Sequence, residues 1–134
     1  MLGEDELRRW AEKVLGFSSA QQTEVSIYTS DSALTRFANN AIHQNVAERD
    51  TQVMVRALMD KKVGVASGNS LEEGELRRVV ETAAELARHQ VENPDLAPLP
   101  SPLPYSKKAA VVEATARCTP EARAAAAGIV CRQA

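Results

Sequence analysis

Apolar side chains recur three and four positions apart along residues 4–15, as they do on one face of an amphipathic helix. This face comprises Leu7, Trp10, Ala11, Val14 and Leu15. Acidic residues fill the first turn, where the helix dipole favours negative charge. Gly16 is placed to end the helix in the left-handed conformation. The pattern predicts a first helix over residues 4–15.

From residue 23 to residue 68 the apolar period changes to two, which is the period of strands that bury one face. Clusters of turn-forming residues divide this region at four places, namely 29–32, 39–40, 49–50 and 60–62. Connections this short join antiparallel neighbours, because a parallel return needs a long crossover. The pattern predicts five strands, of which the fourth, at 51–59, is apolar on both faces and should be the most buried.

A second helix is expected to begin at Ser70 and to end near His89. Ser70 as N-cap and Glu73 at the third helical position have the sequence of a capping box. The buried stripe of this helix would comprise Leu76, Val79, Val80, Ala83, Leu86 and Ala87. A last helix should open at Thr119, where an N-cap residue is followed by proline at the first helical position.

The fold class expected from these elements is α+β, with a five-stranded antiparallel meander packed on one face by the first two helices. Residues 91–106 hold five of the six prolines, which excludes a regular helix or an interior strand there. The organisation expected is an α+β domain at 1–90, a proline-rich linker at 91–118 and the start of a further helix at 119–134. That helix runs to Ala134 without a C-cap, so we expect the chain to be a piece of a larger protein.

Composition narrows the classes of partner. The 134 residues carry a net charge of -2 and a pI near 5.7, so no basic field draws in nucleic acid. No apolar run approaches the roughly 18 residues of a membrane span. The acidic, amphipathic N-terminus is unlike a signal peptide, so a cytoplasmic protein is expected. Cys118 and Cys131 lack close ligand partners and are expected to be reduced thiols.

The candidate site surrounds the Asn39–Asn40 pair. Asn tolerates positive φ, so this pair suits the centre of a type I′ hairpin turn. Large polar side chains follow directly in the next strand. They form either a polar sheet face that contacts peptide or a partner domain, or a solvated strand beside a tight turn. The candidate contact residues are Arg36, Asn39, Asn40, His43, Gln44 and Asn45.

Three stretches carry a resemblance to a known family. They are residues 34–45, residues 53–56 with 63–69, and the helix at 71–88, followed by 114–116 and 119–121. In this order they resemble the N-terminal domain of the TldD/PmbA (TldE) family, zinc metallopeptidases also described as modulators of DNA gyrase. The resemblance covers nearly the whole chain.

The resemblance implies that the catalytic centre lies outside this chain. Peptide-cleaving members hold zinc with a His-Glu-x-x-x-His helix and a later Cys, the Glu serving as base towards the metal-bound water. The only histidines here, His43 and His89, are not followed by Glu. We therefore expect no catalytic residue, no metal ligand and no cofactor in this chain, and no hydrolysis by it alone. Zinc is expected in the catalytic part of TldD-type members.

The function implied is that of a non-catalytic N-terminal domain of a peptidase. It would help to build a homodimer or a TldD–TldE heterodimer and the walls of a chamber that admits unfolded peptide. A sheet edge could also accept such a peptide by strand addition. The alternative is an interaction module that acts on gyrase-related proteins without a peptidase role. Membrane partners are not expected, and direct nucleic-acid binding is disfavoured by charge and by the few aromatic residues.

Overall fold

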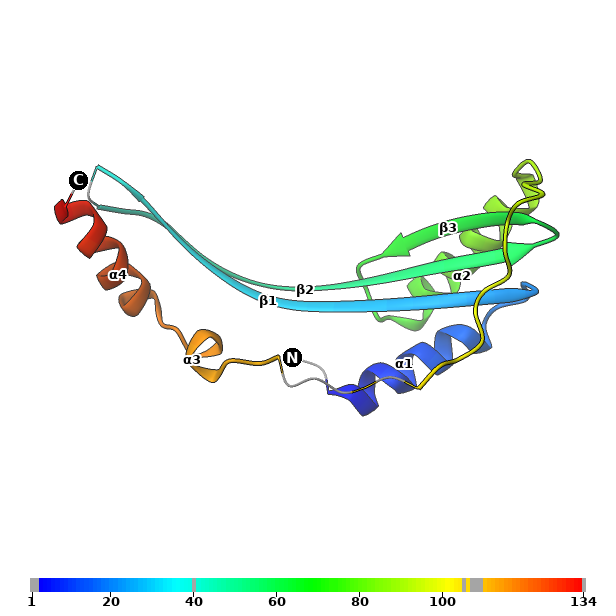
Figure 1. Cartoon of the computed structure of the whole chain (residues 1–134), viewed down its shortest axis with the longest axis horizontal. Helices are drawn as coiled ribbons and strands as arrows, with labels where there is room; N and C mark the ends of the chain where they lie inside the picture. The colour runs from blue at the N-terminus through cyan, green and yellow to red at the C-terminus, as the bar shows by residue number, and fades with distance from the viewer. Residues whose placement is uncertain (1–2, 40, 105, 107–109, 134) are drawn as a thin grey trace. The chain divides into compact units, whose positions relative to one another are not determined.

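The fold comes from a computed structural model, which describes residues 3–39, 41–104, 106 and 110–133 (Figure 1). One sheet with strand order β1-β2-β3 accompanies four helices in this part of the chain. The elements in chain order are α1 (Glu4–Gly16), β1 (Gln22–Ala38), β2 (Ala41–Met59), β3 (Lys62–Gly68), α2 (Glu73–His89), α3 (Glu113–Ala116) and α4 (Pro120–Gln133).

The chain divides into two compact units. The first unit comprises Met1–Ser30 and Arg49–Ser101, and the second unit comprises Asp31–Glu48 and Pro102–Ala134. Strands β1 and β2 run through both units. The sequence at 91–118, expected to be one linker, therefore contributes to both units and contains the single turn α3.

The antiparallel sheet has three strands, so the prediction of five is wrong. The expected turns at 29–32 and 49–50 lie inside β1 and β2. Neither cluster contains Gly or Pro, and Thr and Ser are compatible with extended backbone, so nothing forces the chain to turn. The two clusters instead lie where each strand passes from one unit to the other.

Two of the predicted turns are present in the structure, and both have non-glycine residues at positive φ. Asp60 and Lys61 have φ of 46° and 62°, as the two central residues of a type I′ turn require, between the paired residues Met59 and Lys62. Asn39 has φ of 51° at the β1–β2 connection, while Asn40 lies outside the described residues. The turn predictions at 39–40 and 60–62 are confirmed in the residues that are described.

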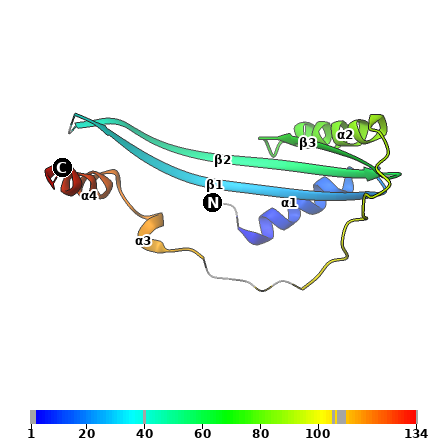
Figure 2. The same cartoon turned by 45° about the horizontal axis from the view of Figure 1, so that its top comes forward.

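Helices α1 and α2 cover one face of the sheet, as predicted, and form the core with it (Figure 2). Alternate residues of β2, namely Val53, Val55 and Ala57, are almost completely buried beneath the helices. On the other face of the same strand Leu58 is buried but Met54 is 36% exposed, so burial of both faces is only partial. The buried cluster comprises Val14, Val53, Val55, Ala57, Leu76, Val79, Val80 and Ala83.

Small residues on β3 allow α2 to approach the sheet closely. Gly64 lies opposite Ala57, and a Cβ built on Gly64 would be 2.1 Å from the main-chain oxygen of Ala83 and 2.4 Å from the nitrogen of Ala87. No side chain fits between backbones at that distance. Gly64 therefore marks a close approach of two backbones, which is one of the usual roles of glycine within a strand.

Two helix ends differ from the prediction. Helix α2 begins at Glu73, and Ser70 Oγ accepts from the Glu72 amide at 3.1 Å instead of capping the helix. Leu71 packs against the core, which keeps the chain extended for two further residues. Gly16 does not adopt positive φ, because α1 continues through it to a right-handed C-cap at Phe17, whose ring also packs on the core.

Residues 91–101, named the strap here, cross the face of the sheet opposite the helices. Their main chain is fixed at both ends: the Asn93 amide donates to the Lys61 carbonyl at 2.9 Å, and the Leu99 amide donates to Gln22 Oε1 at 2.9 Å. The Lys61 ammonium donates to the Leu96 carbonyl between them, also at 2.9 Å. Leu58 lies beneath the strap and is only 7% exposed for that reason.

In the second unit, none of the described residues is buried. Helix α4 begins with the predicted N-cap, since Thr119 Oγ1 accepts from the Ala122 amide at 3.2 Å. One face of α4 is half-buried, and its members are Pro120, Arg123, Ala124, Ala127 and Gly128. No helix in the described parts of the chain is long and apolar enough to cross a bilayer.

Candidate functional site

The predicted contact residues lie on the hairpin of the second unit. Arg36 is on β1, Asn39 is in the turn, and His43, Gln44 and Asn45 follow on β2. All five side chains are exposed, and Asn40 is outside the described residues. The strands therefore present polar groups to solvent near the turn.

A hydrogen-bonded cluster joins one of these residues to α4. The Arg123 guanidinium donates to Thr35 Oγ1 at 3.0 Å, to Asn45 Oδ1 at 3.3 Å and to the Cys118 carbonyl at 2.6 Å. Thr35 Oγ1 in turn donates to Asn45 Oδ1 at 2.9 Å. One planar cation thus ties β1, β2 and the start of α4 together.

This cluster separates the predicted residues onto two faces. Side chains alternate along a strand, so His43 shares the α4-facing side with Asn45, whereas Gln44 points to the opposite side. Arg36, next to Thr35, also points to the opposite side. The described members of this set on β1 and β2 therefore do not form one surface. Thr35 and Arg123 are not among the residues that the sequence predicted for this site, and they lie 88 positions apart.

Metal chemistry finds no support in the described part of the chain. Within it, no group of three or more His, Cys, Asp and Glu side chains is placed to hold a metal ion. Cys118 and Cys131 are exposed free thiols. The contacts around Asn45 are hydrogen bonds from Arg123 and Thr35.

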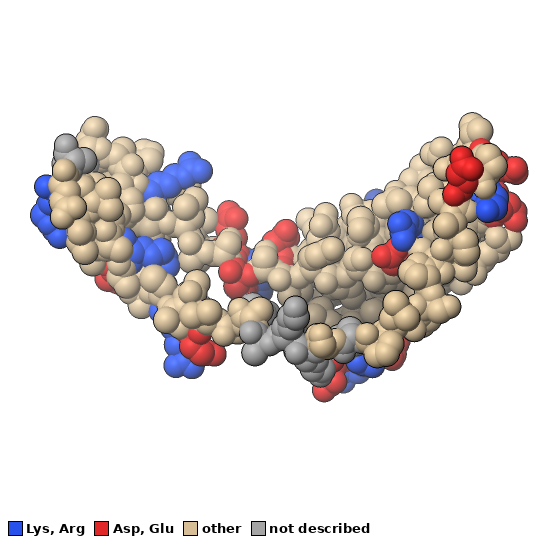
Figure 3. All heavy atoms as spheres, viewed as in Figure 1, with Lys and Arg blue, Asp and Glu red and all other residues tan. Residues whose placement is uncertain are grey.

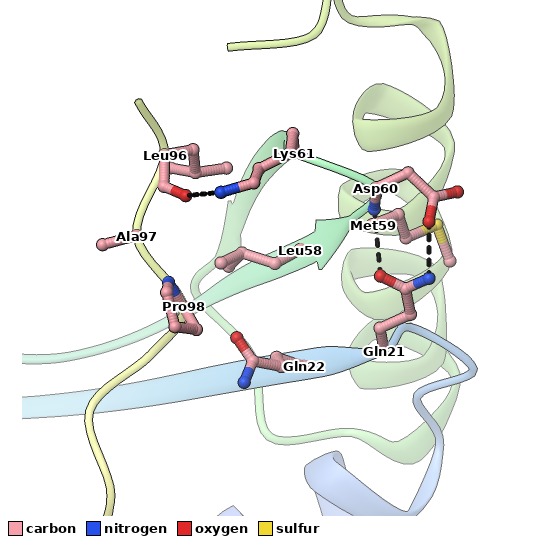
Figure 4. Close-up of a pocket in the computed structure, with 9 residues that line it drawn as sticks. All are labelled: Gln21, Gln22, Leu58, Met59, Asp60, Lys61, Leu96, Ala97 and Pro98. Atoms are coloured by element: carbon pink, nitrogen blue, oxygen red, sulfur yellow. Dashed lines mark hydrogen bonds between the residues drawn. The ribbon is translucent and has the colours of Figure 1, made fainter. Parts of the chain in front are cut away.

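A pocket of about 470 Å³ lies in the first unit, where the strap passes over the sheet (Figure 4). This volume is within the range of about 300–1,000 Å³ usual for ligand pockets. Three elements meet at it: the start of β1, the turn after β2 and the strap. The lining residues are Gln21, Gln22, Leu58, Met59, Asp60, Lys61, Leu96, Ala97 and Pro98.

The carboxamide of Gln21 holds the turn beside this pocket. Its Nε2 donates to Asp60 Oδ1 at 2.7 Å, and its Oε1 accepts from the Asp60 amide at 2.9 Å. The second bond satisfies the backbone amide of a residue at positive φ, and the first holds the side chain of the same residue. No periodic signal in the sequence relates Gln21 to Asp60, so the pocket was not foreseen.

A charged network links α1 to α2 on the surface of the first unit. Lys13 Nζ is 2.8 Å from Glu73 Oε2, and Arg77 Nη2 is 2.8 Å from Glu73 Oε1. Hydrogen bonds from Lys13 and then Arg77 lower the pKa of Glu73. Arg77 also stacks at 3.9 Å from the centroid of the Phe17 ring. These contacts join the two helices and do not form a site.

Acidic and basic side chains are interspersed on the face of the molecule seen in Figure 3. On the surface of α2, for example, Arg77 and Arg78 pair with Glu73 and Glu75. The paired charges on α2 therefore do not form a basic strip of the kind that binds nucleic acid.

Comparisons with known proteins agree with this fold. Residues 23–87 match the family model described as PmbA/TldA metallopeptidase domain 1. Residues 23–87 therefore have the sequence of the first domain of the PmbA/TldD family. The match spans β1, β2, β3 and most of α2, which together build the covered sheet of the first unit.

A solved structure has the same fold at low sequence identity. The crystal structure of TldE from Thermococcus kodakarensis superposes with a TM-score of 0.66 and 21% identity. The match covers 77% of this chain but only 23% of the TldE chain. A search of curated proteins finds no match. The chain therefore spans less than a quarter of the length of that TldE.

Proposed function

We propose that this chain serves as a non-catalytic domain of a PmbA/TldD-type zinc metallopeptidase of the cytoplasm. The match of residues 23–87 to the first domain of that family carries the proposal. The two histidines of this chain are also not followed by Glu, as the first histidine of a His-Glu-x-x-x-His segment would be. Zinc and the attacking water would be held by another part of the enzyme, and this domain would help to form the chamber that admits unfolded peptide.

Assembly is the second part of the proposal, and the second unit supports it. Several large apolar side chains of this unit are more than half exposed, and none of its described residues is buried. A unit of this kind gains most from a partner that covers these side chains, either in a homodimer or in a TldD–TldE heterodimer. The residues concerned are Ile42, Leu103, Val111, Val112, Ile129 and Val130.

Light scattering of the chain, alone and mixed with a full-length zinc-bearing family member, tests assembly. We expect a stable complex, and we expect Ile42→Lys with Val130→Lys to weaken it. Val91→Lys is the matched control, because Val91 is 88% exposed but lies on the strap of the first unit. A complex that tolerates the double substitution as well as the control would place assembly elsewhere.

Peptide hydrolysis tests the non-catalytic role. We expect the isolated chain to cleave no unfolded peptide, with or without added zinc. Cleavage that copurifies with the chain and is abolished by a chelator would overturn the proposal.

The alternative is a module that binds gyrase-related proteins without a role in proteolysis. The exposed polar face of the hairpin is compatible with this function as well. A DNA-supercoiling assay with purified gyrase separates the two, because only the alternative expects the chain to change the rate of supercoiling.

A further inference from the structure

The pocket between the strap and the sheet has the chemistry of a peptide subsite. We propose that it binds one aliphatic side chain of an extended peptide, and that Lys61 and Gln22 donate hydrogen bonds to the adjacent carbonyl or carboxylate of that peptide. The inference rests on the proposed function only for the source of the peptide.

The apolar half of the pocket fits an aliphatic side chain. Leu58 and Met59 contribute from β2, while Leu96, Ala97 and Pro98 contribute from the strap (Figure 4). The strap is fixed at Leu96 and Leu99, so this wall is in place before any ligand arrives. A preformed apolar wall reduces the entropy lost when a ligand binds.

The polar half of the pocket is rich in donors. Gln22 uses its Oε1 to accept from the Leu99 amide, which leaves the two hydrogens of its Nε2 for a ligand. Lys61 uses one of three ammonium hydrogens on the Leu96 carbonyl. A ligand that combines an aliphatic group with acceptor oxygens satisfies both halves, and a residue of a peptide chain is such a ligand.

The strap itself shows that these side chains recognise peptide main chain. Lys61 binds a carbonyl and Gln22 binds an amide of the same extended segment, three residues apart. A second extended peptide beside the strap would meet the same two side chains through their remaining hydrogens. A soluble anion without an aliphatic group would leave the apolar half unfilled.

An NMR titration of the whole ¹⁵N-labelled chain tests this site. The probes are acetyl-Ala-Leu-Ala-amide, the same peptide with a free carboxylate, and acetyl-Ala-Ser-Ala-amide. We expect saturable shifts of the amides of Gln22, Lys61 and Leu99 with at least one leucine peptide, and about tenfold weaker binding of the serine peptide.

Two variants separate the polar contacts. Gln22→Glu keeps the acceptor for the Leu99 amide and removes the Nε2 donor, so it should weaken leucine-peptide binding about tenfold without releasing the strap. If the ligand is a chain terminus, Lys61→Gln should weaken binding of the leucine peptide with a free carboxylate more than binding of the leucine peptide with an amide end. If the ligand is an internal residue, it should weaken binding of both peptides equally. Lys62→Gln, outside the pocket lining, is the matched control and should change neither.

Binding that is equal for leucine and serine peptides, or unchanged in Gln22→Glu, would overturn the proposal. Shifts that grow with protein concentration in the absence of peptide would instead identify a second copy of the chain as the occupant. Either result leaves the assembly test untouched, because its double substitution lies in the second unit.

Discussion

The two units of this chain are stabilised by different means. The first unit buries eleven hydrophobic side chains between two helices and a sheet. The second unit buries none of its described residues, and the Arg123 cluster provides its hydrogen bonds between strands and helix. Burial contributes far more free energy per residue than solvent-accessible hydrogen bonds do. Intrinsic stability is therefore concentrated in the first unit. The second unit leaves more of its described side chains exposed to solvent.

The largest expected effect is at Gly64. Gly64→Val would force α2 away from β3, because the obstructing atoms belong to the backbone of α2. We expect a loss of more than about 4 kcal/mol of unfolding free energy, measured by urea denaturation. Gly74→Ala is the control, since a Cβ there meets nothing within 4 Å outside its own helix. The control should be neutral or stabilising by about 0.5–1 kcal/mol.

Truncation of one aliphatic side chain in each unit contrasts them directly. Leu76 is fully buried in the first unit, so Leu76→Ala should cost about 3 kcal/mol. Ile129 is 54% exposed in the second unit, so Ile129→Ala should change the stability by less than about 0.5 kcal/mol. Equal losses in thermal or urea unfolding would contradict the contrast between the units.

Loss of the Arg123 guanidinium should affect only the second unit. Arg123→Met removes the donors to Thr35, Asn45 and Cys118 while keeping an aliphatic stem. We expect about 1 kcal/mol of lost protection in α4 by amide hydrogen exchange, with unchanged protection in α2. Arg132→Met, in the last turn of the same helix, serves as the control. A loss of protection in α2 would show that the units are coupled.

The smallest effects concern two glutamates, one in each unit. Lys13→Met should raise the pKa of Glu73 towards its ordinary value and leave Glu121 unchanged. The pKa of Glu121 is lowered by its own backbone amide and then by the Thr119 hydroxyl, so Thr119→Val should raise it. Both contributions to stability are present above the pKa of an unfolded glutamate and are lost as pH falls through the lowered value. Carboxyl-carbon NMR titrations would measure each pKa. A shifted pKa of Glu121 in Lys13→Met, or of Glu73 in Thr119→Val, would contradict this assignment.

Local sequence patterns predicted most of the first unit. The helical spacing of apolar residues located α1 and α2, and the period of two located the buried residues of β2. Strand ends were harder, because the turn-forming residues at 29–32 tolerate extended backbone when no glycine or proline forces a bend. The helix start at Glu73 was missed for a tertiary reason, the packing of Leu71 on the core.

The sites depended on contacts that no local pattern encodes. Asn45 was singled out for its polarity, but its partner Arg123 lies 78 positions away. The pocket needs Gln22 and Leu99, which are 77 positions apart, to meet through a side chain and a backbone amide. The paired carboxamides at 21–22 and the prolines of the strap were visible in the sequence. Their meeting follows only from the path of the strap across the sheet.

The uninterrupted course of β1 and β2 has a consequence for pairing errors. Residues 31–34 and 41–45 are exposed on both faces of their strands, so burial does not distinguish one alignment of these segments from another. A slip of one residue is penalised instead in the first unit, where it would turn Val25 and Ile27 away from the helices. The same slip would part Thr35 from Asn45. The register of β1 and β2 at the hairpin end is therefore set by the core of the first unit, to which the hairpin end contributes no side chain.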